Sequence, residues 1–155
     1  MATLVGTQKS LVAALDALLE LDYDAIEAYK AAIERIDDET DKAQLRAFLA
    51  DHERHTVELT PIIARLGGTP SKGPDVKQWL TKGKVVILGL AGAHAVLLAM
   101  KTNEEDTNTA YERMLQRDDV PADVRPILER NLADEWRHKA WIEARLGASK
   151  PAAAT

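Results

Sequence analysis

Apolar residues recur every three or four positions along four stretches of the chain, which is the spacing of one face of an α-helix. In the first stretch, residues 8–36, this face carries Leu11, Leu15, Ile26 and Ile33. Comparable stripes follow in residues 41–66, 85–115 and 122–146. The pattern therefore predicts four long helices.

The connections between these stretches indicate how the helices pair. The first and second helices are joined by a short turn, and so are the third and fourth, so each pair is expected to form an antiparallel hairpin. The middle connection begins at Gly67-Gly68 and is rich in glycine and proline as far as Pro74. It is long enough to cross the bundle from end to end, with a short turn or helix at residues 78–80. Two hairpins joined by a long crossover make an all-α, ferritin-like four-helix bundle.

Local signals refine these boundaries. Thr40 is the expected N-cap of the second helix, and Pro61 inside that helix is expected to kink it. We assign residues 1–147 to one helical-bundle domain and expect residues 148–155 to form a flexible tail.

An internal repeat relates the two hairpins. Residues 49–55 (LADHERH) match residues 132–138 (LADEWRH) at five of seven positions, at an offset of 83. Ala28-Tyr29 in the first helix matches Ala110-Tyr111 in the third at an offset of 82. The second hairpin is therefore interpreted as a copy of the first.

Ionisable residues interrupt each apolar stripe at positions that face the core. Folding each hairpin about its turn brings these residues to one height, and the repeat relates the two hairpins. The predicted layer contains Asp22, His52, His55, Glu104, Glu135 and His138. His94 also falls on the inner face, but about 15 Å of helical rise separates it from Glu104, so a structural role is expected.

Burying three unpaired carboxylates would cost several kcal/mol each. Residues three apart on a helix share a face, so His52 and His55 converge, as do Glu135 and His138. Three carboxylates and three imidazoles can hold two divalent ions, and this donor set suits iron, manganese or zinc. The donor set alone leaves these three metals open.

The layer resembles that of the ferritin-like di-iron carboxylate superfamily, in which two helices give one acid each and two give Glu-x-x-His. This resemblance implies two iron ions, with manganese or zinc as alternatives. The sequence from Asp134 to His138 (DEWRH) is similar to the motif of its oxygen-activating members. Within it, the chain looks most like the bacterial DUF2383 family of four-helix, stress-associated proteins. That likeness rests on LGGTP at residues 66–70, Trp79, and Glu104-Glu105 ahead of Tyr111.

One residue departs from the superfamily pattern. Position 52 holds histidine, where the resemblance implies a glutamate that often bridges the metals. Three carboxylates against two divalent ions leave a net charge of about +1, which favours the divalent state. Tight binding of one ion and weak binding of the other is an alternative.

Four further residues are candidates for supporting the ligands. Asp51 and Asp134 each precede a ligand pair and are expected to accept the ring N–H of a histidine on a neighbouring helix. Tyr29 and Tyr111 lie one heptad from Asp22 and Glu104, where they either bond a ligand carboxylate, act as redox-active phenols or simply fill the core. No catalytic group beyond the metal ligands and these candidates is expected.

Composition removes several other classes of function. The chain has no cysteine, which excludes disulfides, thiol catalysis, Cys-ligated zinc and iron–sulfur clusters. Its net charge is −5 and no basic patch is evident, so nucleic acid is not an expected partner. The start of the sequence lacks a signal-peptide pattern, and the most apolar run, residues 85–100, is shorter than a membrane span. A cytoplasmic protein without a membrane partner is expected.

Three interpretations remain open. The first is an oxidase, peroxidase or ferroxidase acting on O2, peroxide or Fe(II), with an external electron donor because cysteine is absent. The second is a non-enzymatic, metal-binding or stress-associated bundle, which would be compatible with a homodimer. The third is a metal-free polar network that fixes helix register; a bis-histidine haem site is a weaker variant, because three carboxylates would crowd the porphyrin.

Overall fold

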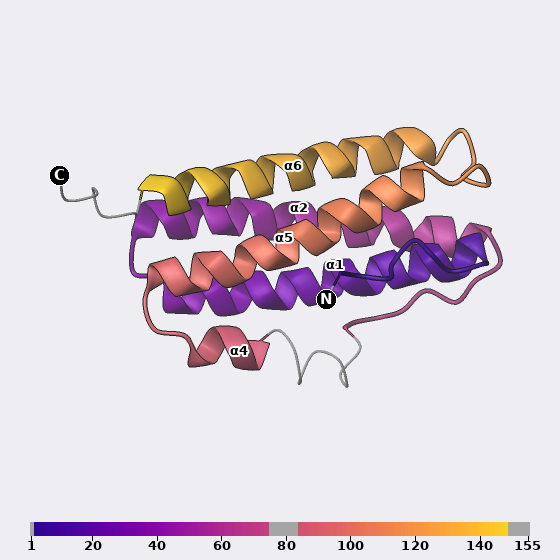
Figure 1. Ribbon diagram of the computed structural model, residues 1–155. Coiled ribbons are helices and arrows are strands. Elements are labelled where there is room, and N and C mark those ends of the chain that lie inside the picture. Colours follow the sequence, from indigo (N-terminus) through magenta and orange to yellow (C-terminus); the bar gives the residue numbers. More distant parts are fainter. Residues whose placement is uncertain (1, 75–83, 149–155) are drawn as a thin grey trace.

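The computed structural model describes residues 2–74 and 84–148, and these contain helices and no strands. The helices are α1 (Leu11–Arg35), α2 (Glu39–Arg65), the short α4 (Lys84–Gly89), α5 (Ala93–Leu115) and α6 (Arg125–Ala148). Figure 1 shows the four long helices lying alongside one another. α1 packs against α2 and α5, while α6 packs against α5 and α2. The all-α helical bundle predicted from apolar periodicity is confirmed.

The start of α2 differs from the prediction. Its N-cap is Asp38, whose side chain accepts a hydrogen bond of 2.9 Å from the backbone N–H of Asp41. The expectation that Thr40 caps the helix is wrong, because Thr40 already lies in the first turn. An aspartate at the cap satisfies a free amide and places negative charge at the positive end of the helix dipole. α2 continues through Pro61, and whether it kinks there stays a prediction.

The third predicted helix, residues 85–115, is interrupted. The structure divides it into α4 and α5, with Gly92 at a φ of +86° as the N-cap of α5. This left-handed backbone conformation is accessible to glycine and ends the helical path, which apolar periodicity alone does not reveal. His94 falls in the first turn of α5 and is exposed, so its expected place on the inner face is wrong.

The crossover begins close against α1. At Gly68 an added Cβ would lie 2.4 Å from Cγ1 of Val12, so only glycine fits without rearrangement. Three residues later, the backbone N–H and the hydroxyl of Ser71 each donate a 2.8 Å hydrogen bond to the carboxylate of Asp16 on α1. These contacts fix the direction in which the chain leaves the first hairpin.

Two predicted segments lie largely beyond the described ranges. The short element expected at residues 78–80 lies outside them, and so does the tail expected from residue 148, apart from Ala148, which ends α6. None of the described helices is both long and apolar enough to cross a membrane.

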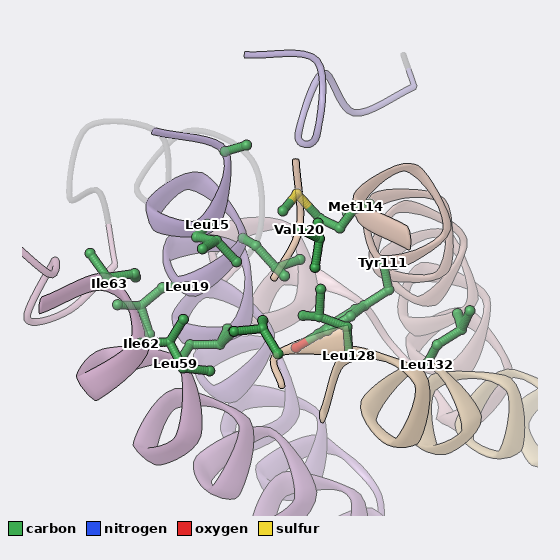
Figure 2. Packing of buried hydrophobic residues seen from close by; sticks show 14 residues of the cluster. Leu15, Leu19, Leu59, Ile62, Ile63, Tyr111, Met114, Val120, Leu128 and Leu132 are labelled. Carbon is green, nitrogen blue, oxygen red and sulfur yellow. The ribbon is translucent and has the colours of Figure 1, made fainter. Parts of the chain in front are cut away.

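Two apolar clusters lie along the bundle, one toward each end. One cluster includes Leu15, Leu59, Met114 and Leu128, and Figure 2 shows its side chains interlocking between the four long helices. The other includes Ile36, Leu45, Met100 and Ile142. On each long helix at least one buried polar residue lies between the two clusters, so the apolar packing encloses a polar layer in the middle of the bundle.

Candidate metal centre

The six residues predicted to form the polar layer do lie together. Each is at most 1% exposed, and every long helix contributes at least one of them. They form two overlapping groups; within each group, one nitrogen or oxygen atom from each side chain lies within 4.8 Å of those from the others. The Asp22 group consists of Asp22, His52, His55 and Glu135; the Glu104 group consists of His52, Glu104, Glu135 and His138.

The Asp22 group has the spacing of ligands around one ion. Oδ1 of Asp22 lies 2.8 Å from Nδ1 of His52 and 3.2 Å from Nδ1 of His55. Oε1 of Glu135 lies 3.5 Å and 3.3 Å from the same two nitrogens. Ligands bound tetrahedrally to zinc at about 2.0–2.1 Å would lie about 3.3 Å apart. The four donors therefore need little movement to bind an ion.

The Glu104 group is more open. Oε1 of Glu104 lies 3.7 Å from Nε2 of His52, and its Oε2 lies 3.7 Å from Nδ1 of His138. The same nitrogen of His138 lies 3.8 Å from Oε2 of Glu135. The repeat thus produces two similar half-sites, the Asp22 group and the Glu104 group, and the distances between nitrogen and oxygen atoms are longer in the second.

Two of the histidines contact aspartates that lie outside the layer. Nε2 of His138 lies 2.9 Å from Oδ2 of Asp51, and Nε2 of His55 lies 3.2 Å from Oδ2 of Asp134. Each bond runs between α2 and α6, so each aspartate holds the histidine of the other hairpin. Nδ1 of both rings therefore faces the layer. In many metal sites an outer carboxylate bonds one ring nitrogen of a histidine in this way, and the other nitrogen binds the metal.

Two arginines hold the outer aspartates in place. Arg54 and Arg137 each pair with both Asp51 and Asp134, forming a ring of charges across α2 and α6. Burial raises the pKa of Asp51, but His138 and the two arginines lower it to about 2. The aspartate is therefore an anion at neutral pH and remains a hydrogen-bond acceptor for the ring.

The two tyrosines hydrogen-bond to carboxylates of the opposite hairpin. The hydroxyl of Tyr111 on α5 donates a 2.7 Å bond to Oδ2 of Asp22 on α1. Tyr29 on α1 donates to Oε1 of Glu104 on α5. Both rings are fully buried, and burial raises the pKa of both phenols well above its usual value. Both tyrosines therefore stay protonated and donate to the carboxylates of Asp22 and Glu104.

The three histidines are basic in this environment. Burial lowers the pKa of each imidazole, but the carboxylates around it prevail and raise the pKa to about 9 for His52, 11 for His55 and 10 for His138. Burial raises the pKa of Asp22 and Glu135, and the facing histidines bring both below their usual values. Without metal, three imidazolium cations therefore face three carboxyl groups. A divalent ion would take the place of the protons on the inward-facing nitrogens.

Several atoms of the polar layer lack hydrogen-bond partners. Among the described residues, five buried atoms of the layer accept or donate no hydrogen bond: Nε2 of His52, Oε2 of Glu104, both carboxylate oxygens of Glu135 and Nδ1 of His138. Buried polar atoms without partners are costly, and each needs an explanation. All five belong to imidazole or carboxylate groups that face the layer, so bound metal ions would satisfy them. The residues present therefore fit a metal centre.

Asn108 is a further residue beside the layer that the sequence analysis does not identify. Its side-chain Nδ2 donates to the backbone carbonyl of Glu104 at 2.7 Å and to that of Glu135 at 3.2 Å, tying α5 to α6 beside the layer. The signal was available, since Asn108 lies four residues after Glu104 on the same helical face.

Comparisons with known proteins identify a family and a fold for this chain. The model of the domain of unknown function DUF2383 matches residues 10–117, which is more than half of the chain. The chain belongs to the DUF2383 family. The match covers α1, α2 and α5, so Glu135 and His138 on α6 lie outside it. No protein among those with curated descriptions matches the chain.

A solved structure shares the fold. The crystal structure of a conserved hypothetical protein, rv2844, from Mycobacterium tuberculosis aligns with a TM-score of 0.75 over 92% of this chain and 94% of that one. The two sequences are 17% identical, so this similarity concerns the fold alone.

Proposed function

We propose that this DUF2383 protein binds divalent metal ions, two per chain, in the polar layer at the middle of its bundle. The five unpartnered ligand atoms carry this proposal, because an apolar or purely hydrogen-bonded layer would not leave them facing one another. In the metal-bound protein, Asp22 and His55 would bind one ion, and Glu104 and His138 the other. His52 and Glu135, which belong to both groups, would contact both half-sites.

The donor set narrows the choice of metal. Three imidazoles and three carboxylates suit iron, manganese and zinc better than magnesium or calcium, which prefer all-oxygen sites. If all three imidazoles were neutral, three carboxylates would leave two divalent ions with one uncompensated positive charge. Such a site favours ions that remain divalent. Iron is the first candidate because of the likeness to the di-iron carboxylate superfamily.

Metal content per chain tests the proposal. Untagged protein would be stripped with a chelator, reloaded with Fe²⁺ under argon, with Mn²⁺ or with Zn²⁺, dialysed and analysed for metal. We expect about two ions per wild-type chain and none in the Glu135→Ala/His138→Ala variant. His94→Ala is the matched control, since it removes an exposed histidine far from the layer and should leave the content unchanged. A wild-type protein that takes up no metal and is equally stable with or without chelator would favour the metal-free polar network.

Redox chemistry is a second candidate function, and the tyrosines favour it. Each phenol contacts a ligand carboxylate directly, so two oxidisable groups lie beside the proposed metals. An oxidase, peroxidase or ferroxidase would use these metals to react with O2, peroxide or Fe²⁺, and would take electrons from an external donor because the chain has no cysteine.

Turnover separates this candidate from a metal-binding bundle without enzymatic activity. Iron-loaded protein would be mixed with peroxide or O2 and a small-molecule electron donor, and consumption followed over many equivalents. Sustained consumption that is lost in Glu135→Ala/His138→Ala would support the enzyme. A single stoichiometric reaction, followed by none, would support the non-enzymatic function.

A further inference from the structure

His52 is oriented differently from the other two histidines of the layer. His55 and His138 each direct Nε2 outward to an aspartate and Nδ1 inward. His52 has no such outer contact among the described residues: Nδ1 lies 2.8 Å from Oδ1 of Asp22, and Nε2 faces Glu104 at 3.7 Å without forming a hydrogen bond. Both of its nitrogens therefore face ligand groups.

The two nitrogens of His52 face different half-sites. Nδ1 lies beside Asp22, which belongs only to the Asp22 group, and Nε2 lies beside Glu104, which belongs only to the Glu104 group. Glu135, the residue that corresponds to His52 in the repeat, likewise directs one carboxylate oxygen toward each half-site. Oε1 of Glu135 lies 3.3 Å from Nδ1 of His55, and Oε2 lies 3.8 Å from Nδ1 of His138.

We propose that the imidazole ring of His52 lies between the two metal ions and binds one through each nitrogen. This inference rests on the proposed function, since it assumes that two ions bind. A ring bound at both nitrogens has lost both N–H protons to solvent and carries one negative charge. The anion balances the positive charge left by three carboxylates and two divalent ions. His52 then supplies the charge of a bridging glutamate, but over a longer span.

The distance between the two ions is the measurable consequence of such a bridge. Two metal–nitrogen bonds of about 2.0–2.1 Å, added to roughly 2.2 Å between the ring nitrogens, place the ions about 6 Å apart. Carboxylate-bridged pairs in two-metal sites lie about 3.5–4 Å apart. At the wider spacing, a single oxygen atom cannot bind both ions at once. A His52-bridged centre would therefore hold two ions without the shared-oxygen geometry of a close pair.

Anomalous X-ray scattering from crystals of the full chain loaded with Zn²⁺ tests the proposal. We expect two zinc peaks about 6 Å apart, on either side of the His52 ring. Two peaks about 3.5–4 Å apart, or a ring bound to one ion, would overturn it. A single zinc site, confirmed by titration in solution, would also overturn the bridge while leaving metal binding intact. No zinc in either measurement would overturn the proposed function itself.

His52→Glu is the informative variant, because it gives position 52 the residue of its repeat counterpart. We expect it to bind two Zn²⁺ with the separation shortened to about 3.5–4 Å. An unchanged separation in this variant would show that His52 does not set the spacing. Should the variant fail to fold, the wild-type zinc positions decide the question alone.

Discussion

Tyr111 on α5 donates a 2.7 Å hydrogen bond to Asp22 on α1, and its repeat counterpart Tyr29 on α1 donates to Glu104 on α5. The two bonds cross between the hairpins in opposite directions. Asp51 and Asp134 follow the same rule on α2 and α6, where each bonds the histidine of the other hairpin. Every long helix is therefore tied to the other hairpin through a residue that contacts a member of the polar layer.

Removal of the Tyr111 hydroxyl should destabilise the metal-free protein. In Tyr111→Phe, Oδ2 of Asp22 loses its donor inside a buried layer, which costs about 1–3 kcal/mol. Urea unfolding of chelated protein would measure the change. Tyr23→Phe, at a half-buried tyrosine on the same helix as Asp22 but outside the layer, is the matched control. Equal stability of the two variants would mean that the hydrogen bond contributes nothing.

The outer aspartates should matter for metal affinity more than for folding. Asp51→Asn removes the carboxylate that orients His138, and loss of such a partner typically weakens metal binding by about 10–100-fold. Competition between the protein and a chromophoric Zn²⁺ chelator would measure this. Asp37→Asn, at an exposed aspartate in the connection between α1 and α2, serves as the control and should bind as the wild type does. Unchanged affinity in Asp51→Asn would contradict a positioning role.

Most of the fold can be predicted from the sequence, because burying one face of a helix requires apolar residues at a regular spacing. The stripes of Leu, Ile and Ala predict four long helices, and the short turns predict which helices pair. The break at Gly92 is different in kind, since it depends on a backbone conformation and not on which side chains are apolar. The cap at Asp38 differs from the expected Thr40 for a related reason: both residues can cap a helix, they lie two positions apart, and only the path of the chain decides between them.

The members of the polar layer were also predictable, because an ionisable residue in an apolar stripe is costly unless it has partners. The repeat then placed residues of the two hairpins at one height. Side-chain orientation was not predictable in the same way. That His52 directs both nitrogens inward, while His55 and His138 direct one outward, depends on which acidic residue of another helix lies within reach of each ring. The sequence places all three on the same kind of helical face.

Replacing two histidines by leucine should abolish stabilisation by metal. In wild-type protein, Zn²⁺ at about 100 times its dissociation constant would raise the free energy of unfolding by about 2.7 kcal/mol. His52→Leu/His138→Leu removes ligands from both groups, so added Zn²⁺ should produce no stabilisation. Urea unfolding with and without Zn²⁺ provides the measurement. If the variant gains as much from Zn²⁺ as the wild type, the ions bind elsewhere.

The pH dependence of stability should differ between the metal-free and metal-bound forms. In the metal-free fold, the carboxylates raise the pKa of His52, His55 and His138 to about 9, 11 and 10. A raised pKa means that the folded state binds protons more tightly than the unfolded state. The resulting stabilisation is complete below the unfolded pKa of about 6.5 and is lost as pH rises through 9–11.

Bound metal should offset this loss of stability above neutral pH. Asp22 and Glu135 have lowered pKa values, so their contribution is lost only in acid and does not affect the alkaline side. Ligation requires deprotonated inward-facing nitrogens, so Zn²⁺ binding releases protons and strengthens as pH rises. Thermal unfolding at pH 6, 7.5 and 9 should therefore show a falling Tm in chelator and a growing gain in Tm from Zn²⁺. A gain that is independent of pH would mean that these imidazoles are not the ligands.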